Sequence, residues 1–145
     1  MIDTSAALAR FESLLTEHGF DRARPEPRLA WEAFKAFAKV PVACSHDALL
    51  FQTGVYSLSG PESFQLDFTR QFELPEDGQY SGMEQLHCTF HFPPSAAARA
   101  LATNLWSMNA PSLDAFFGQV EATPQFRAAL EMGRPVRVEL YQESV

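Results

Sequence analysis

Two histidines placed four residues apart are the first feature of the sequence that could do chemistry. His87 and His91 lie in the segment GMEQLHCTFHF, residues 82–92. On a helix, this spacing is typical of zinc ligands. On a strand the two side chains share one face but stand about 13 Å apart, so each needs an acid such as Asp67 or Glu139 from a neighbouring strand to hold a metal. We expect two surface histidines and no metal site.

A thiol, an imidazole and a carboxylate follow one another closely at Cys44, His46 and Asp47. A nucleophile and its base are brought together by the fold and not by adjacency in sequence, so we interpret this stretch as the polar entry to a strand. The sequence contains no P-loop, no glycine-rich dinucleotide pattern, no G-x-S-x-G and no H-E-x-x-H. These absences argue against an enzyme and against a cofactor, although a small lyase or isomerase with scattered carboxylates would leave no motif.

The two cysteines have neither the spacing of a metal motif nor that of a disulfide framework. Cys88 falls on the apolar side of an alternating segment, where we expect a free, buried thiol that packs as a small hydrophobic side chain. The first twenty residues are amphipathic and carry acids, unlike a signal peptide, and no segment reaches transmembrane length. We therefore expect a cytoplasmic protein.

Arg70 is the most unusual residue of the segment SFQLDFTRQFEL, residues 63–74. Apolar and polar residues alternate there with the period of a half-buried strand, and Arg70 falls among the phenylalanines. If the alternation is unbroken, the guanidinium is buried and pairs with a carboxylate or lines a pocket for an anion. If the strand contains a β-bulge, or if the side chain snorkels, the guanidinium reaches solvent. We favour the second interpretation and keep the first as an alternative.

The elements that would position these residues follow from periodicity and from turn residues. Residues 63–74 and 82–92 are the two clearest strands. The other helix and strand boundaries are marked by turn and capping residues: Gly19, the prolines at 25, 27 and 41, Gly133, and the Ser or Thr before each later helix. The predicted helices cover the ranges 4–18, 27–39, 95–106, 112–122 and 124–132, and the other predicted strands lie within 48–58 and 135–142.

The resulting order, ααβββααβ with a short extra helix, predicts an α+β fold in one domain over residues 1–145. We expect an antiparallel sheet of three to four strands, with the N-terminal and C-terminal helices packed on its phenylalanine-rich face. The aromatic stripe of residues 27–39 is then part of the core. The opposite, polar face of the sheet is the candidate functional surface, and it carries Tyr56, Gln65, Asp67, Thr69, Gln71, Gln85, His87, Thr89, His91, Arg137, Glu139 and Tyr141.

The net charge of −7 is concentrated in the strand-rich middle of the chain. Residues 41–92 contain seven acidic residues and a single basic residue, Arg70, and so account for −6. An acidic surface disfavours nucleic acid and anionic membrane and favours a basic partner, although solvation alone is the other common explanation of such acids.

These observations lead to two hypotheses about function. The first is a small acidic interaction module, of the adaptor, inhibitor or immunity type, that binds a basic protein through the polar sheet face and the acidic loop at Glu76 and Asp77. The alternative is a small enzyme or small-anion-binding protein with a phenylalanine-lined pocket around Arg70, in which Tyr56, Asp67 or His87 supplies polar groups. We also expect a homodimer.

Overall fold

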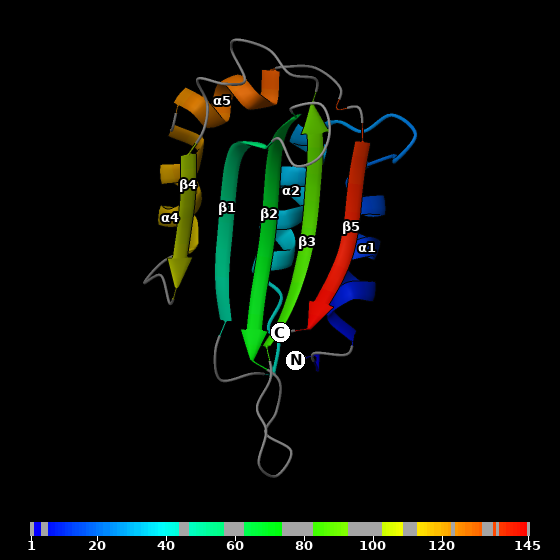
Figure 1. Ribbon diagram of the computed structural model, residues 1–145. Coiled ribbons are helices and arrows are strands. Elements are labelled where there is room, and N and C mark those ends of the chain that lie inside the picture. Colours follow the sequence, from blue (N-terminus) through cyan, green and yellow to red (C-terminus); the bar gives the residue numbers. More distant parts are fainter. Residues whose placement is uncertain are drawn as a thin grey trace.

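The computed structural model describes residues 2–3, 6–43, 47–56, 63–73, 83–92, 103–108, 113–122, 124–131, 135 and 137–144 (Figure 1). Its helices are α1 (Ala7–Glu17), α2 (Pro27–Ala38), α4 (Leu113–Ala122) and α5 (Pro124–Glu131). Its strands are β1 (Asp47–Tyr56), β2 (Ser63–Glu73), β3 (Met83–Phe92), β4 (Thr103–Met108) and β5 (Arg137–Ser144).

The strands form one five-stranded sheet in the order β4-β1-β2-β3-β5, and every neighbouring pair is antiparallel. The predicted meander β1-β2-β3 occupies the centre, and β5 returns to pair with β3. Figure 1 shows α1 and α2 behind the sheet, with α4 and α5 beside β4. The α+β class and the packing of helices on one face are therefore confirmed.

The prediction of a helix over 95–106 is wrong in its second half, because residues 103–108 form the edge strand β4. Leu105 lies opposite Phe51 of β1, and residue 106 lies opposite Leu50. A six-residue segment is too short for helical and strand periods to be told apart, and pairing with an open sheet edge outweighs a weak local preference. Residues 95–102 lie outside the described part of the chain.

Helix α1 ends in a Schellman motif at Gly19, one of the boundary residues identified in the sequence. Gly19 has φ 80°, a left-handed conformation that glycine adopts without a steric penalty. The N–H of Phe20 donates to the carbonyl of Leu15 at 2.9 Å, and that of Gly19 donates to the carbonyl of Thr16 at 3.0 Å. At the other end, the Asp3 carboxylate accepts a hydrogen bond from the N–H of Ala6 at 3.0 Å. The turn at Gly19 directs the chain from the end of α1 towards α2.

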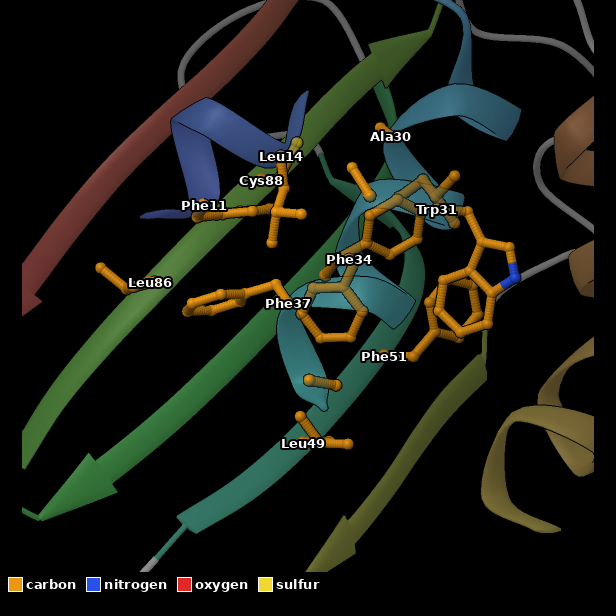
Figure 2. Close-up of a cluster of buried hydrophobic side chains, with 14 of the residues drawn as sticks. Phe11, Leu14, Ala30, Trp31, Phe34, Phe37, Leu49, Phe51, Leu86 and Cys88 are labelled. Carbon is orange, nitrogen blue, oxygen red and sulfur yellow. The ribbon is translucent and has the colours of Figure 1, made fainter. Parts of the chain in front are cut away.

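A layer of aromatic rings fills the space between the sheet and the helices (Figure 2). Trp31 of α2 lies at its centre, with ring centroids 5.4 Å from Phe68 and 5.9 Å from Phe51 of the sheet. The same indole lies 4.9 Å from Phe126 of α5 and 5.7 Å from Phe117 of α4. Such pairs stabilise by about 1 kcal/mol each beyond the burial of their surface. The aromatic stripe of α2 is thus core, as predicted, and it joins all the layers.

No helix in the described ranges is both long enough and apolar enough to span a bilayer.

Candidate functional site

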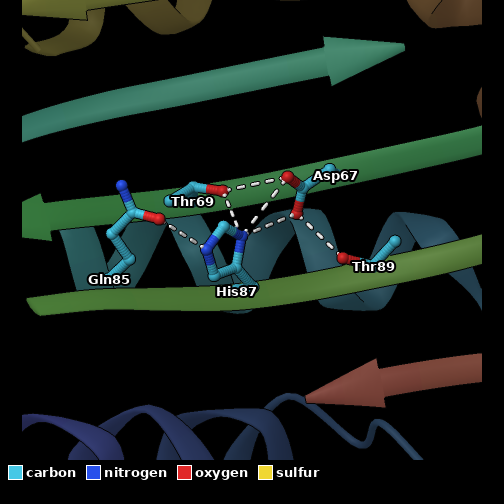
Figure 3. Close-up of polar contacts among 5 residues, drawn as sticks. All are labelled: Asp67, Thr69, Gln85, His87 and Thr89. Atoms are coloured by element: carbon cyan, nitrogen blue, oxygen red, sulfur yellow. Dashed lines mark hydrogen bonds and ion pairs between the residues drawn. The ribbon is translucent and has the colours of Figure 1, made fainter. Parts of the chain in front are cut away.

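The sheet face turned away from the helices carries a cluster of polar side chains on β2 and β3 (Figure 3). The register places Asp67 opposite Thr89 and Thr69 opposite His87, so four polar residues form a square on one face. Thr69, His87 and Thr89 are 2%, 8% and 5% exposed, and Asp67 is half-buried. Asp67 and His87, both candidates from the sequence, are therefore brought together.

The Asp67 carboxylate is the acceptor at the centre of this cluster. Its Oδ1 accepts a hydrogen bond from the Thr89 hydroxyl at 2.9 Å, and its Oδ2 accepts one from the Thr69 hydroxyl at 3.1 Å. The Nδ1 atom of His87 lies 3.4 Å from each carboxylate oxygen. Hydrogen bonds of this kind to a carboxylate contribute about 1.5–3 kcal/mol each, so the cluster is a rigid part of the sheet.

The Thr69 hydroxyl bridges Asp67 and His87. It donates to Oδ2 of Asp67 at 3.1 Å. Its oxygen also lies 2.9 Å from Nδ1 of His87, a contact in which the donor depends on the tautomer of the ring.

The other ring nitrogen of His87 faces Gln85. Its Nε2 lies 2.9 Å from the side-chain oxygen of Gln85. The donor in this contact depends on the tautomer of the ring and on the orientation of the Gln85 amide. For either tautomer, the Gln85 side chain is hydrogen-bonded to Nε2, the ring nitrogen that a catalytic histidine would turn towards a substrate. The arrangement is typical of a structural network and not of a general base.

His91 forms a second contact of this type, one step along the same strand face. Its Nε2 lies 3.0 Å from Oε1 of Glu139 on β5, and its side chain is 6% exposed while that of Glu139 is 41% exposed. The prediction that His87 and His91 are surface histidines is wrong: both are buried. The physical reason is that each finds a carboxylate on an adjacent strand, and this pairing offsets the cost of removing a polar ring from water.

Arg70 lies on the opposite face of the sheet from this cluster, inside the core. The ladder is continuous on both sides of it, with Leu49 and Leu86 as its register partners, and its exposure is 2%. The interpretation that we favoured, a β-bulge or a snorkelling side chain, is therefore wrong. The alternation of β2 is unbroken, and the guanidinium is buried among the phenylalanines.

The partners of Arg70 explain how a buried guanidinium is tolerated. Its Nε and Nη2 donate to the two oxygens of Asp47 at 3.0 and 2.5 Å. Nη1 donates to the carbonyl of Phe37 at 2.7 Å, and Nη2 donates to the carbonyl of Val40 at 3.0 Å. Its Cζ also lies 4.8 Å from the centre of the Phe37 ring. Arg70 thus joins the end of α2 to the sheet, and these contacts give no support to an anion pocket around it.

The remaining candidates from the sequence are only partly described. Tyr56 is the last residue of β1 and lies opposite Ser63, and its side chain is not described. Glu76 and Asp77 lie outside the described residues, as do Cys44 and His46. In the described ranges, no three histidine, cysteine or acidic side chains come close enough together to hold a metal ion.

Cys88 is free and fully buried, as the sequence predicts. Burial raises the pKa of its thiol to about 12, and the nearby Asp67 carboxylate acts in the same direction. The thiol is therefore protonated at neutral pH and is not a nucleophile.

One charged cluster between α2 and α4 was missed in the sequence. Glu121 accepts a hydrogen bond from the indole N–H of Trp31 at 3.0 Å and another from Lys35 at 2.6 Å. Lys35 also lies 3.1 Å from Glu32. Trp31 and Lys35 are one helical turn apart, which places them on the same face of α2. Nothing in the sequence indicated that Glu121 lies opposite this face.

This cluster shifts two pKa values. The hydrogen bond from Lys35 lowers the pKa of Glu121, with the indole of Trp31 acting in the same direction against partial burial. Burial alone would lower the pKa of Lys35, but its hydrogen bonds to Glu121 and Glu32 outweigh this effect and raise it. The ion pair is therefore maintained over a wide pH range.

Comparison with known proteins gave no relative from which a role could be transferred: no protein-family model, curated protein or solved structure matches the chain.

Proposed function

We propose that this chain is a small acidic interaction module that binds a basic protein on the helix-free face of its sheet. The class of protein is that of adaptors, inhibitors and immunity-type proteins. The observation that carries the proposal is the buried polar network of Asp67, Thr69, His87 and Thr89 on a face that no described helix covers.

A fixed polar network favours recognition because binding then costs little side-chain entropy. The side chains of Asp67 and His87 are 15% and 11% exposed, and each is held by neighbours on β2 and β3. Preorganised polar groups lose less freedom on association than mobile ones. The half-buried Gln65 and Gln71 extend the same face along β2. The surface so formed suits a partner with hydrogen-bond donors.

The charge distribution supports a basic partner. Residues 41–92, which include β1, β2 and β3, carry −6 of the net −7. Complementary charge raises the association rate and makes it dependent on salt. The same acids disfavour nucleic acid and anionic membrane as partners.

The test is a pull-down from lysate of the source organism at low salt, eluted with a salt step. We expect one basic protein in stoichiometric amount from the unmodified chain. The variant Glu76→Lys/Asp77→Lys should capture markedly less of it, because these changes reverse the charge of the acidic segment between β2 and β3.

A matched control is available on α1, where Glu12 and Glu17 are exposed. Glu12→Lys/Glu17→Lys changes the net charge by the same amount on a helix and should leave capture unchanged. Equal loss of capture in both variants would show a non-specific charge effect, and capture that salt does not weaken would also contradict the proposal.

We infer in addition that the protein acts in the cytoplasm and forms a homodimer. The free thiol of Cys88 suits a reducing compartment. In the described sheet, β4 and β5 are the edge strands, each paired on one side only with another described strand, and such edges commonly pair with a second copy. Sedimentation equilibrium at the mass of a single chain would contradict the dimer, and fractionation of cells would test the location.

A further inference from the structure

A cavity of about 240 Å³ lies between α2 and the pair α4 and α5, on the helix side of the molecule. Its floor is apolar and includes Trp31, Phe126 and Leu130. Trp31 and Phe126 are 1% and 0% exposed, so their rings are fixed by the core and offer only an edge to the cavity. Figure 2 shows Trp31 at the end of the aromatic cluster nearest to these helices. The floor is therefore a rigid, preformed surface.

Two of the acids that line this cavity are paired with the same lysine, so this cluster keeps a net charge of −1. Glu121 is bound by Lys35 and by the indole N–H of Trp31, and Glu32 is paired with Lys35. Lys35 thus contributes one positive charge shared between two carboxylates. The cluster holds the indole in place and leaves Glu121 with little capacity to attract a further cation.

Two arginines stand at the rim, Arg28 on α2 and Arg127 on α5, and both are exposed. Within the described part of the chain, neither guanidinium has an ion-pair or hydrogen-bond partner. Glu131 is a lining acid that is likewise without a described partner. The uncommitted groups Arg28, Arg127 and Glu131 thus carry a net charge of +1, which balances the −1 of the cluster of Lys35 with Glu32 and Glu121.

We propose that this cavity binds a small organic carboxylate with a flat apolar body. The apolar body lies against Leu130, which is half-buried, and against the edges of Trp31 and Phe126, and the carboxylate is bound between Arg28 and Arg127. Guanidinium groups match carboxylates in geometry and form two parallel hydrogen bonds with them. Drug-sized ligands occupy cavities of about 300–1,000 Å³, so the smaller volume here fits a single ring with a short acidic side chain.

An aromatic carboxylate fits this lining better than an inorganic anion. Phosphate has no apolar surface to place on Trp31 and Phe126, and its second negative charge would be repelled by Glu131. A cation is disfavoured because Arg28 and Arg127 stand at the entrance.

The experiment uses phenylacetate as the probe and the indole N–H signal of Trp31 in NMR as the reporter, assigned with Trp31→Phe. We expect a saturable shift of this signal. Phenylacetamide, the neutral analogue, should bind at least about tenfold more weakly, as should phenylacetate to Arg127→Gln, since loss of one charge-assisted contact has an effect of this order. Arg127 is exposed, so the variant is expected to fold.

The control is Arg10→Gln, which removes an exposed arginine of α1 and should leave the affinity for phenylacetate unchanged. The proposal is overturned by the absence of a saturable shift, by equal affinity for the amide, or by equal affinity for inorganic phosphate. Benzylamine binding more tightly than phenylacetate would also overturn it, because the acids would then dominate the lining. The site is on the helix side, so these outcomes are independent of whether a basic protein binds the sheet face.

Discussion

Arg70 is tolerated in the core because its guanidinium donates four hydrogen bonds to acceptors in the described structure. Two of the acceptors are the carbonyl groups of Phe37 and Val40 near the end of α2, of which that of Phe37 also accepts from the N–H of Val40 at 3.0 Å, and the other two are the oxygens of Asp47. The carboxylate is itself 37% exposed, so only one of the two charges is fully removed from water. This arrangement costs less than a fully buried ion pair.

Replacement of Arg70 by Met is therefore expected to destabilise the protein by about 3 kcal/mol, because the carbonyl of Val40 loses its donor, that of Phe37 loses one of two donors, and Asp47 loses its partner. Urea unfolding followed by circular dichroism measures the change. Arg10→Met, on the exposed face of α1, is the control and should change the free energy of unfolding by less than about 0.5 kcal/mol. A change of that small size for Arg70→Met would contradict the structural role of the residue.

Thr89 tests the polar network on the other face of the sheet. Thr89→Val keeps the shape of the side chain but removes the hydroxyl that donates to Asp67 at 2.9 Å. We expect a loss of about 1–2 kcal/mol in urea unfolding, since a half-buried carboxylate loses one donor. A neutral or stabilising effect would mean that Asp67 does not depend on the network.

At the residue scale, the sequence predicted which residues share a face better than it predicted their burial. Strict alternation placed Arg70 with the phenylalanines and Asp67 with His87, and the structure agrees. Burial depends on partners far away in the chain, such as Asp47 for Arg70 and Glu139 for His91. No local pattern indicates Asp47 as the partner of Arg70, and Glu139 was identified only as an acid on a neighbouring strand, so the solvent-exposed interpretation of Arg70 and of the histidines was wrong.

At the scale of elements, α2 connects the sheet to the other described helices. It packs on the sheet through Trp31 and Phe34, meets α1 through Phe37, and is joined to α4 by the ion pair of Lys35 with Glu121. Each helix is too short to be stable alone, so its position is set by these tertiary contacts.

The ion pair between α2 and α4 should make stability depend on pH in a defined direction. The folded state lowers the pKa of Glu121, so the stabilising contribution is present above the ordinary pKa of glutamate and is lost as pH falls through the folded value. For Lys35, whose pKa is raised, the contribution is present below the ordinary pKa of lysine and is lost as pH rises through the folded value.

The measurement is urea unfolding of the unmodified chain and of Glu121→Gln between pH 7 and pH 3. The difference in stability between them should be larger at pH 7 and should shrink towards pH 3. Because the side chain of Glu121 is 44% exposed, the effect is small and is reduced by salt. A difference that grows as pH falls would contradict the ion pair.

The edge strand β4 is the element that the sequence did not reveal. The helices α1 and α2 and the strands β1, β2, β3 and β5 were predicted because each is bounded by turn residues and has a clear period. Residues 103–108 have neither, and their conformation is set by pairing with β1. Nuclear Overhauser contacts between the backbones of Phe51 and Leu105 are expected, and medium-range helical contacts in their place would contradict the strand.

At the scale of the whole molecule, the two faces of the sheet have different roles. One face and the helices form the aromatic core, in which ten of the described aromatic side chains are at most 1% exposed. The other face carries a polar network that contributes no apolar surface to that core. An ordered polar face without a described covering layer is the feature that the proposed protein-binding function uses.

The proposed function requires the partner to bind the helix-free face of the sheet, and site-specific photo-crosslinking measures where it binds. A photoreactive amino acid is placed at Gln71, on the helix-free face of β2, or at Glu17, on the exposed side of α1, before the low-salt pull-down. We expect a crosslink to the basic partner from position 71 and none from position 17. A crosslink from position 17 alone would place the partner on the helices and contradict the proposed function.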